Sequence, residues 1–241
     1  METRYFYVPD TPAEGTLPAE EAAHAVKVLR LKPGDELMLM DGNGTFYQAA
    51  VVSASQHQCA YRVLHELPQP RQWQPHLHLA IAPTKLTDRM EWLVEKAVEI
   101  GVDEISFLEC QYSERRQLKM PRLEKIAVSA MKQSHKAWKP VLNDLVPFES
   151  FVAAHTTGSR FIAHCYANSQ RFNLWQQLQD VTADTLVMVG PEGDFSPREV
   201  EQAVNAGFVP ADLGKSRLRT ETAGLSAVMM MQLRASQVSI L

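Results

Sequence analysis

The sequence predicts an α/β protein with a mainly parallel sheet, preceded by a small β-barrel. Two observations predict this fold. Short strand-like stretches dominate the start of the chain, whereas strands alternate with helices after residue 76, which is the pattern of a parallel sheet. Residues 68–75 hold three prolines and show no helical or strand period, so this segment is predicted to be a linker. The predicted domains are residues 1–70 and 76–241.

The first domain is expected to consist of short strands separated by tight turns. Residues 32–35 (Lys-Pro-Gly-Asp) and 41–44 (Asp-Gly-Asn-Gly) carry the turn chemistry, because proline presets φ and glycine reaches positive φ without a steric cost. One short helix is expected at 24–29. The strands are expected at 5–8, 36–40, 45–52 and 58–64.

The second domain is expected to alternate strands with capped helices. Asp88 and Glu91 form a capping pair for a helix at 88–100, which Gly101 stops. Ser196 precedes a proline and a glutamate in the N-cap pattern of a second helix, which Gly207 stops. The strands are expected at 77–82, 104–108, 160–165, 185–189 and 208–213, and the other helices at 121–138, 172–178 and 220–237.

The composition indicates a soluble cytoplasmic protein without a metal site. With 45% hydrophobic and 22% charged residues, the 241-residue chain can bury a packed core. Its three cysteines show no C-x-x-C spacing, which argues against a disulfide framework or a four-cysteine zinc site. The N-terminus lacks the apolar stretch of a secretory signal, and the uncharged stretch between Glu221 and Arg234 is too short to span a membrane.

The charge distribution favours a polyanionic partner more than the total charge does. A net charge of −4 by itself argues against nucleic acid. Residues 111–140, however, hold eight basic and two acidic side chains, a net charge of +6. Three aromatic residues lie among these cations: Tyr112, His135 and Trp138. Such a mixture suits nucleic acid, because cations neutralise phosphates and aromatic rings stack on bases. The alternative is a solvated helix face.

Two glycine-containing loops follow predicted strands and mark a candidate ligand cleft. Residues 189–195 lie where a buried strand ends and a capped helix begins, and ligands of parallel sheets bind beyond the carboxyl ends of the strands. Residues 213–224 repeat this arrangement, with three cations before Glu221 at the start of a helix. The alternative for residues 189–195 is a tight turn between strand and helix that binds no ligand. The alternative for residues 213–224 is that Glu221 only caps its helix.

The sequence lacks the motifs that mark several other classes of functional site. The sequence contains no G-x-G-x-x-G after a strand, no G-x-x-x-x-G-K-[ST] and no G-x-S-x-G. A Rossmann dinucleotide site, a P-loop nucleotidase and an α/β-hydrolase are therefore disfavoured. His76 and His78 have no matched partners, so no metal ligand is predicted.

The two loops resemble the RsmE family of ribosomal RNA methyltransferases, in the SPOUT superfamily. The matching motifs are Gly190-Pro191-Glu192-Gly193, Leu213-Gly214 and Leu218-Arg219-Thr220-Glu221-Thr222-Ala223. Further matches lie at 4–6, 24–30, 85–91, 95–102 and 133–134, so the resemblance covers essentially the whole chain. The family usually has glycine in place of Asp194, and arginine after the Gln-Ser pair, where this chain has His135 and Lys136.

The resemblance implies a PUA-like, RNA-binding β-barrel at 1–70 and a SPOUT methyltransferase domain with a C-terminal trefoil knot at 76–241. It implies a homodimer that transfers a methyl group from S-adenosylmethionine to N3 of a uridine in 16S rRNA of the small ribosomal subunit. The implied cofactor-binding residues are Gly190, Pro191, Glu192, Gly193, Leu213, Gly214, Leu218, Thr220, Thr222 and Ala223. The expected RNA-binding residues are Arg4, His24, Lys27, Arg30, Lys85, Arg89, Arg115, Arg116, Gln133 and Lys136.

The implied chemistry needs a group that removes the N3 proton and a group that stabilises the uridine anion. Glu221 or Glu192 fits the first role, and Arg219 fits the second. Each of them would alternatively position the cofactor or a loop. The alternative functions are a non-enzymatic RNA-binding module, a SPOUT methyltransferase acting on another RNA, and a Rossmann-type oxidoreductase.

Overall fold

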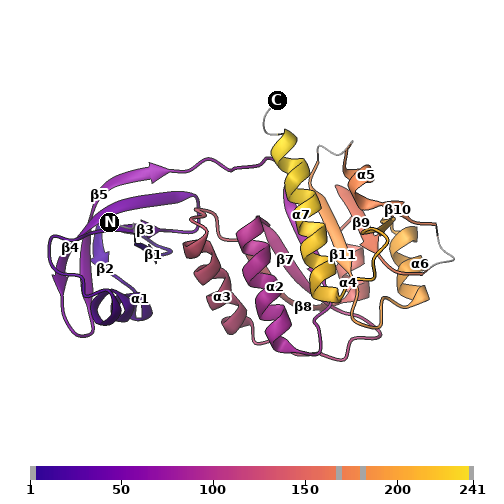
Figure 1. The fold of residues 1–241 in the computed structure, drawn as a ribbon, viewed down its shortest axis with the longest axis horizontal. Helices are drawn as coiled ribbons and strands as arrows, with labels where there is room; N and C mark the ends of the chain where they lie inside the picture. Colours follow the sequence, from indigo (N-terminus) through magenta and orange to yellow (C-terminus); the bar gives the residue numbers. More distant parts are fainter. Residues whose placement is uncertain (1–3, 167–169, 180–182, 239–241) are drawn as a thin grey trace. The chain divides into compact units, whose positions relative to one another are not determined.

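The structure is a computed structural model that describes residues 4–166, 170–179 and 183–238. The contacts between residues divide the chain into two compact units (Figure 1). The first unit contains residues 4–71 and 131–139, and the second contains residues 72–130 and 140–238. The short segment 131–139, which was predicted within 76–241, thus groups with the first unit. The backbone explains the grouping, because Gly44 N–H donates to Ala137 O (3.0 Å) and Lys139 N–H donates to Gly42 O (2.8 Å).

The first unit contains a five-stranded sheet in the order β1-β3-β4-β5-β2, in which β1 and β3 are parallel and the other pairs are antiparallel. Strand β2 was not predicted, because its sequence Glu-Gly-Thr has no strand-like alternation and only its pairing with β5 makes it a strand. The strands are β1 (Tyr5–Tyr7), β2 (Glu14–Thr16), β3 (Glu36–Met40), β4 (Thr45–Ala54) and β5 (Cys59–Pro68).

A single hydrophobic cluster fills the first unit. Phe6 comes from one edge strand, Leu17 follows the other edge strand, and Tyr61 comes from β5, so the sheet curls around one core. The helical segment begins before the predicted 24–29. It consists of α1 (Ala19–Ala23) and a directly following π-helical turn, η1 (His24–Val28).

The second unit contains a seven-stranded sheet in which every described pair is parallel. Its order is β10-β12-β9-β11-β6-β7-β8, so β11 is inserted between β6 and β9. The strands are β6 (Leu77–Ile81), β7 (Glu104–Glu109), β8 (Val141–Pro147), β9 (Ser159–Ala163), β10 (Phe172–Asn173), β11 (Thr185–Val189) and β12 (Val209–Asp212). The helices are α2 (Thr87–Ile100), α3 (Met120–Gln133), α4 (Phe148–Ala154), α5 (Leu174–Leu178), α6 (Pro197–Asn205) and α7 (Thr220–Val238).

Helices cover both faces of this sheet. On one face α2 and α7 lie side by side, and α7 packs on β6 and β11 (Figure 1). The close approach depends on Gly224, since a Cβ there would lie 2.8 Å from Ile81 Cδ1 and 3.0 Å from Leu93 Cδ1. Residues of the opposite strand face, such as Ala80 and Met188, join a cluster with α4 and α6.

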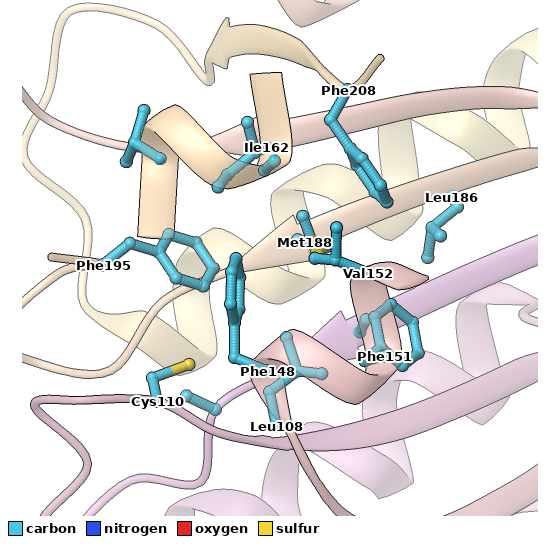
Figure 2. Close-up of a cluster of buried hydrophobic side chains, with 14 residues drawn as sticks. Leu108, Cys110, Phe148, Phe151, Val152, Ile162, Leu186, Met188, Phe195 and Phe208 are labelled. Atoms are coloured by element: carbon cyan, nitrogen blue, oxygen red, sulfur yellow. The ribbon is translucent and has the colours of Figure 1, made fainter. Parts of the chain in front are cut away.

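Aromatic side chains dominate this second cluster. Figure 2 shows Phe148 and Phe151 of α4 beside Phe195 and Met188, and the rings of Phe148 and Phe195 lie 5.4 Å apart. Helix α4 was not predicted. Its seven residues are too few for a helical period to stand out, although Phe148, Phe151 and Val152 occupy one buried face.

Two other predictions about elements need correction, and one strand was missed. The helix predicted at 121–138 ends at Gln133, because His135 takes a positive φ of 51° that a helix does not tolerate. The helix predicted at 172–178 begins at Leu174, because Phe172 and Asn173 pair with β12 and Asn173 caps the helix. Strand β8, an edge strand with mostly half-buried residues, was missed. Within the described residues, no helix has the length and apolar character needed to cross a membrane.

Candidate functional site

A pocket of about 380 Å³ opens at the carboxyl ends of β9, β11 and β12. The insertion of β11 between β6 and β9 makes this edge a point where the strand order reverses, and open parallel sheets bind ligands at such points. The pocket volume suits a small-molecule ligand rather than a macromolecule. The wall comes from the loops after the three strands, from the start of α7 and from Arg89 of α2.

The loop after β11 folds back tightly on itself. A Cβ on Gly190 would lie 2.9 Å from Phe195 N and 3.1 Å from the carbonyl carbon of Asp194, and these backbone atoms cannot move aside as a side chain can. The Tyr166 hydroxyl donates to Phe195 O (2.6 Å) and ties this loop to the loop after β9. Glycine at position 190 is therefore required by the path of the backbone.

Asp194 links two loops of the pocket. It has a φ of 68°, which explains why glycine is usual here in the resembling family. Its carboxylate accepts hydrogen bonds from Cys165 N (2.7 Å) and Phe195 N (2.8 Å). Aspartate tolerates this backbone conformation better than most residues, and here it adds a connection that glycine lacks.

A second set of contacts connects the pocket to the loop between β6 and α2. Glu192 Oε1 accepts a hydrogen bond from Lys85 N (2.9 Å). On the other side of this loop, the Arg115 guanidinium donates to Thr84 O (3.2 Å) and Lys85 O (3.0 Å). Glu192 and Arg115 therefore hold the same loop from two sides.

Glu221 lies buried behind the pocket wall at the start of α7. Its side chain is 8% exposed, and its Oε1 lies 3.4 Å from the Arg89 Nη1 atom. Within the described residues, its Oε2 atom has no hydrogen-bond partner. Buried polar atoms are normally paired, so an unpaired carboxylate oxygen next to a pocket is a mark of a functional group.

Four arginines give the pocket wall its cationic character. Arg171 Nη1 donates to His164 O (2.7 Å), and Arg89 pairs with Glu221. In the part of the chain that the structure describes, neither Arg217 nor Arg219 forms an ion pair, and both are exposed. These two side chains remain available to an anionic ligand or a developing negative charge.

Neither Cys165, which lines the pocket, nor Cys110 carries an activated thiol. Partial burial of the sulfur and the nearby Asp194 carboxylate raise the pKa of the Cys165 thiol, so it stays protonated at neutral pH. Burial also raises the pKa of the Cys110 thiol. Burial lowers the pKa of His164, which is a neutral imidazole at neutral pH.

The structure brings most of the predicted cofactor residues together. Thr222 is exposed and does not line the pocket, whereas Arg219 does line it. The lining includes Gly190, Pro191, Glu192, Gly193, Leu213, Gly214, Leu218, Thr220 and Ala223. Lining residues that were not among the predicted site residues are Ala163, His164, Cys165, Arg171, Val189, Asp194, Ala211, Asp212, Ser216 and Arg217. His164 and Cys165 directly follow β9, so the rule that marked the other two loops would have marked this one too.

The predicted RNA-binding residues divide between the two units. Lys85 and Arg116 form surface ion pairs with Glu114 (2.9 Å) and Glu109 (3.0 Å). Arg115, as described above, holds a loop through its guanidinium. The first unit holds Arg4, His24, Lys27, Arg30, Gln133 and Lys136, and the second holds Lys85, Arg89, Arg115 and Arg116.

The fold and the pocket together define a small-ligand-binding α/β unit joined to a β-rich unit. A family model described as "RNA methyltransferase domain" matches residues 71–232, and one described as "RNA methyltransferase PUA domain" matches residues 17–63. The chain belongs to the RsmE family of RNA methyltransferases. The predicted family and fold class, an α/β parallel sheet preceded by a PUA domain, are confirmed.

Solved structures and curated proteins agree with this assignment. A probable rRNA-methyltransferase from Porphyromonas gingivalis is 44% identical, with a TM-score of 0.91 and coverage of 97% of this chain and 99% of that one. The ribosomal RNA small subunit methyltransferase E from Neisseria gonorrhoeae, solved with S-adenosyl methionine, is 27% identical, with a TM-score of 0.86 and coverage of 96% and 98%. The protein of the same name from Mycobacterium bovis is 28% identical over 95% of this chain and 90% of its own length.

Proposed function

We propose that this protein transfers a methyl group from S-adenosylmethionine to N3 of a specific uridine in 16S rRNA of the small ribosomal subunit. One observation carries the proposal. The pocket at the strand-order reversal is walled by the Gly190–Gly193 loop and by the 218–223 segment, in a chain that a relative solved with S-adenosyl methionine matches over 96% of its length.

The pocket residues fit this cofactor. The volume of about 380 Å³ is in the range of small-molecule sites, and Gly190 and Gly193 both line the pocket. Backbone groups of these glycines, with Leu213, Gly214 and Leu218, would hold it, in the trefoil knot that the family resemblance implies. When bound, S-adenosylmethionine supplies an electrophilic methyl group on a sulfonium.

The chain's own residues would orient the uridine and manage its N3 proton. Arg219 is exposed on the pocket wall and stabilises the uridine anion. Glu221 is the stronger candidate for the base, since its Oε2 atom has no hydrogen-bond partner among the described residues, while its Oε1 atom lies 3.4 Å from Arg89 Nη1. Glu192 is the weaker candidate for the base, since it already accepts a hydrogen bond from Lys85 N.

The protonation state of the two cysteine thiols supports methylation at a ring nitrogen of the base rather than at a ring carbon. Methylation of a pyrimidine carbon needs a nucleophile such as a thiolate to activate the ring by covalent addition. Cys165 and Cys110 are both held in the protonated form by their raised pKa values. Direct transfer to a deprotonated N3 needs no such nucleophile.

The test is methyl transfer to small subunits purified from a strain that lacks this protein. We expect one methyl group from labelled S-adenosylmethionine at N3 of one uridine of 16S rRNA. We also expect S-adenosylmethionine, and not NAD, to raise the melting temperature. Binding of the cofactor without transfer to any RNA would support the non-enzymatic module. Methyl transfer to another RNA, but not to 16S rRNA, would support the alternative of a SPOUT methyltransferase with a different RNA substrate. A melting temperature that is raised by NAD but not by S-adenosylmethionine would support the alternative of a Rossmann-type oxidoreductase.

We propose further that residues 1–70 form an RNA-binding PUA-like domain, that residues 76–241 form the catalytic domain, and that the protein acts in the cytoplasm as a homodimer. The exposed side chains of Met229 (42%) and Leu233 (49%) support the dimer, because they lie four residues apart on one face of α7.

Replacing Met229 and Leu233 by glutamate is expected to convert the dimer to a 27.1 kDa monomer, because the change places charges on an apolar interface. Light scattering of both proteins measures the mass. A monomeric wild-type protein, or a double variant that remains a dimer, would remove α7 from the interface.

A further inference from the structure

Tyr112 is an exposed aromatic residue held on a rigid turn. The turn follows β7 and closes through Ser113 N–H donating to Cys110 O (3.0 Å) and Cys110 N–H donating to Ser113 Oγ (3.0 Å). Gln111 N–H donates to Glu199 Oε1 (2.8 Å), which fixes the other side. Cys110 and Ser113 are buried, but Tyr112 is 45% exposed. The turn therefore keeps this ring at the surface.

The ring lies against the pocket loop. A Cβ on Gly193 would lie 3.1 Å from Tyr112 Cβ and 3.7 Å from Tyr112 Cγ, so the absence of a side chain at Gly193 lets the tyrosine approach. Gly193 itself lines the pocket. Tyr112 thus lies next to a residue of the pocket wall.

The described pocket lining contains no Phe, Tyr or Trp. Tyr166 is near, but its hydroxyl is engaged with Phe195 O and the side chain packs partly against the core. A nucleobase that enters the site consequently finds no aromatic surface on the wall itself. Tyr112 is exposed and rigid, and it adjoins the wall through Gly193.

The surroundings of Tyr112 suit a nucleic acid strand. Arg116 lies on the same loop as Tyr112, and Lys85 lies on a loop joined to it. Their side chains are 63% and 69% accessible, and each forms a surface ion pair, Arg116 with Glu109 and Lys85 with Glu114. The join is made by Arg115, which reaches Lys85 O, and by the Lys85–Glu114 ion pair. Cations beside an exposed ring are the combination that binds phosphates and stacks unpaired bases.

We propose that Tyr112 is the platform on which the target pyrimidine stacks while its N3 atom is presented to the methyl donor. This inference rests on the proposed function. A base that is methylated at a ring nitrogen must leave its stacked or paired position, which costs free energy. Stacking on an exposed, immobile tyrosine offsets part of that cost and favours the presented state.

The test compares Tyr112→Phe, Tyr112→Leu and Tyr112→Ala with the wild-type protein on small subunits at saturating S-adenosylmethionine. Tyr112→Phe keeps the ring, so we expect kcat/KM for the subunit within about twofold of wild type. Loss of the ring in Tyr112→Leu and Tyr112→Ala is expected to lower kcat/KM about tenfold to a hundredfold. The dissociation constant for S-adenosylmethionine and the melting temperature should stay near the wild-type values in all three.

Three results would overturn the inference. Wild-type kcat/KM in Tyr112→Leu would show that the ring is not used. Weaker cofactor binding in Tyr112→Leu, but not in Tyr112→Phe, would assign the ring to the cofactor instead. A wild-type protein that transfers no methyl group to RNA would overturn the proposed function together with this inference, whereas the first two results leave the proposed function intact.

Discussion

Replacing Glu221 by glutamine is expected to lower the single-turnover rate of methyl transfer by about a hundredfold or more. Glutamine keeps the shape of the side chain but neither accepts a proton nor carries the charge that lies 3.4 Å from Arg89 Nη1. The side chain is buried, and within the described residues its Oε2 atom has no partner, so solvent does not readily replace it as the proton acceptor. Affinity for S-adenosylmethionine should change less than the rate, because Glu221 does not line the pocket.

Glu192→Gln is the matched control. Its side-chain oxygen still accepts the hydrogen bond from Lys85 N, so the loop is retained while the carboxylate is lost. We expect a rate within about tenfold of wild type, well above that of Glu221→Gln. The opposite order of the two variants would assign the base to Glu192, and wild-type rates in both would remove both carboxylates from the chemistry.

The second large effect concerns the stability of the second unit in acid. His78 lies buried on β6, and its Nε2 atom lies 2.8 Å from Ser106 Oγ and 3.7 Å from Glu104 Oε1. The ring also packs against Phe151 and His155 at centroid distances of 5.7 and 5.4 Å. Burial lowers the pKa of His78 from 6.5 to about 4, because the charged imidazolium is poorly solvated there.

A lowered histidine pKa makes the folded protein less stable in acid. Below pH 6.5 the unfolded chain binds a proton at this histidine while the folded protein does not, until the pH approaches 4. The contribution is thus fully present above pH 6.5 and decreases as the pH falls. From pH 7.5 to pH 5, the loss in the free energy of unfolding is about 2 kcal/mol.

The neighbouring groups titrate differently. The pKa of Glu104 is lowered to about 2, and the largest cause is the hydrogen bond with His76. Glu104 therefore stabilises the folded protein above its ordinary pKa of 4.5, and this contribution is lost only as the pH falls below that value. The same hydrogen bond raises the pKa of His76, which acts in the opposite direction and stabilises the fold as the pH falls. Because Glu104 and His76 are present in both proteins, a comparison of the wild-type protein with a variant of His78 removes most of their contributions.

His78→Gln is the informative variant, because glutamine can still hydrogen-bond to Ser106 but does not titrate. Hydrogen exchange of the β6 and β7 amides at pH 7.5, 6.5, 5.5 and 5 measures the local free energy of opening. Wild-type stability relative to His78→Gln should decrease by about 2 kcal/mol across this range. The exposed His57 supplies the control, since His57→Gln should show no such trend. A constant difference between wild type and His78→Gln would contradict the prediction.

Local chemistry explains the elements that were predicted well. The turn at 41–44 joins β3 and β4, and Gly42 and Gly44 do take positive φ values of 76° and 99°. The capping box of Ser196 and Glu199 is present at the start of α6, and Gly101 ends α2 with a φ of 124°. Each of these features depends on residues within one turn of the chain, so the sequence contains all the information needed.

The elements that were missed depend on distant partners. Strand β2 exists through pairing with β5, and β8 exists through pairing with β7, although neither segment has a strong strand pattern. His135 ends α3 early, and its ring stacks on Tyr5 with centroids 4.3 Å apart, a contact between residues far apart in the sequence. Tertiary contacts outweighed the helical pattern there.

By itself the sequence determined the fold class, the capped start of α6 and the two glycine loops, because these follow from hydrophobic period, capping residues and strand ends. The predicted capping pair of Asp88 and Glu91 was wrong, because α2 begins at Thr87 after Leu86 and has no side-chain cap hydrogen bond. Tertiary structure decided how the loops combine. Asp194 connects the loops after β9 and β11, and Arg115, which is predicted to bind RNA, also donates to the backbone of the loop between β6 and α2. It also placed Tyr112 against Gly193. The physical reason is that a hydrogen bond or close contact between residues tens of positions apart depends on which strands become neighbours, and the order of the strands along the chain does not specify this.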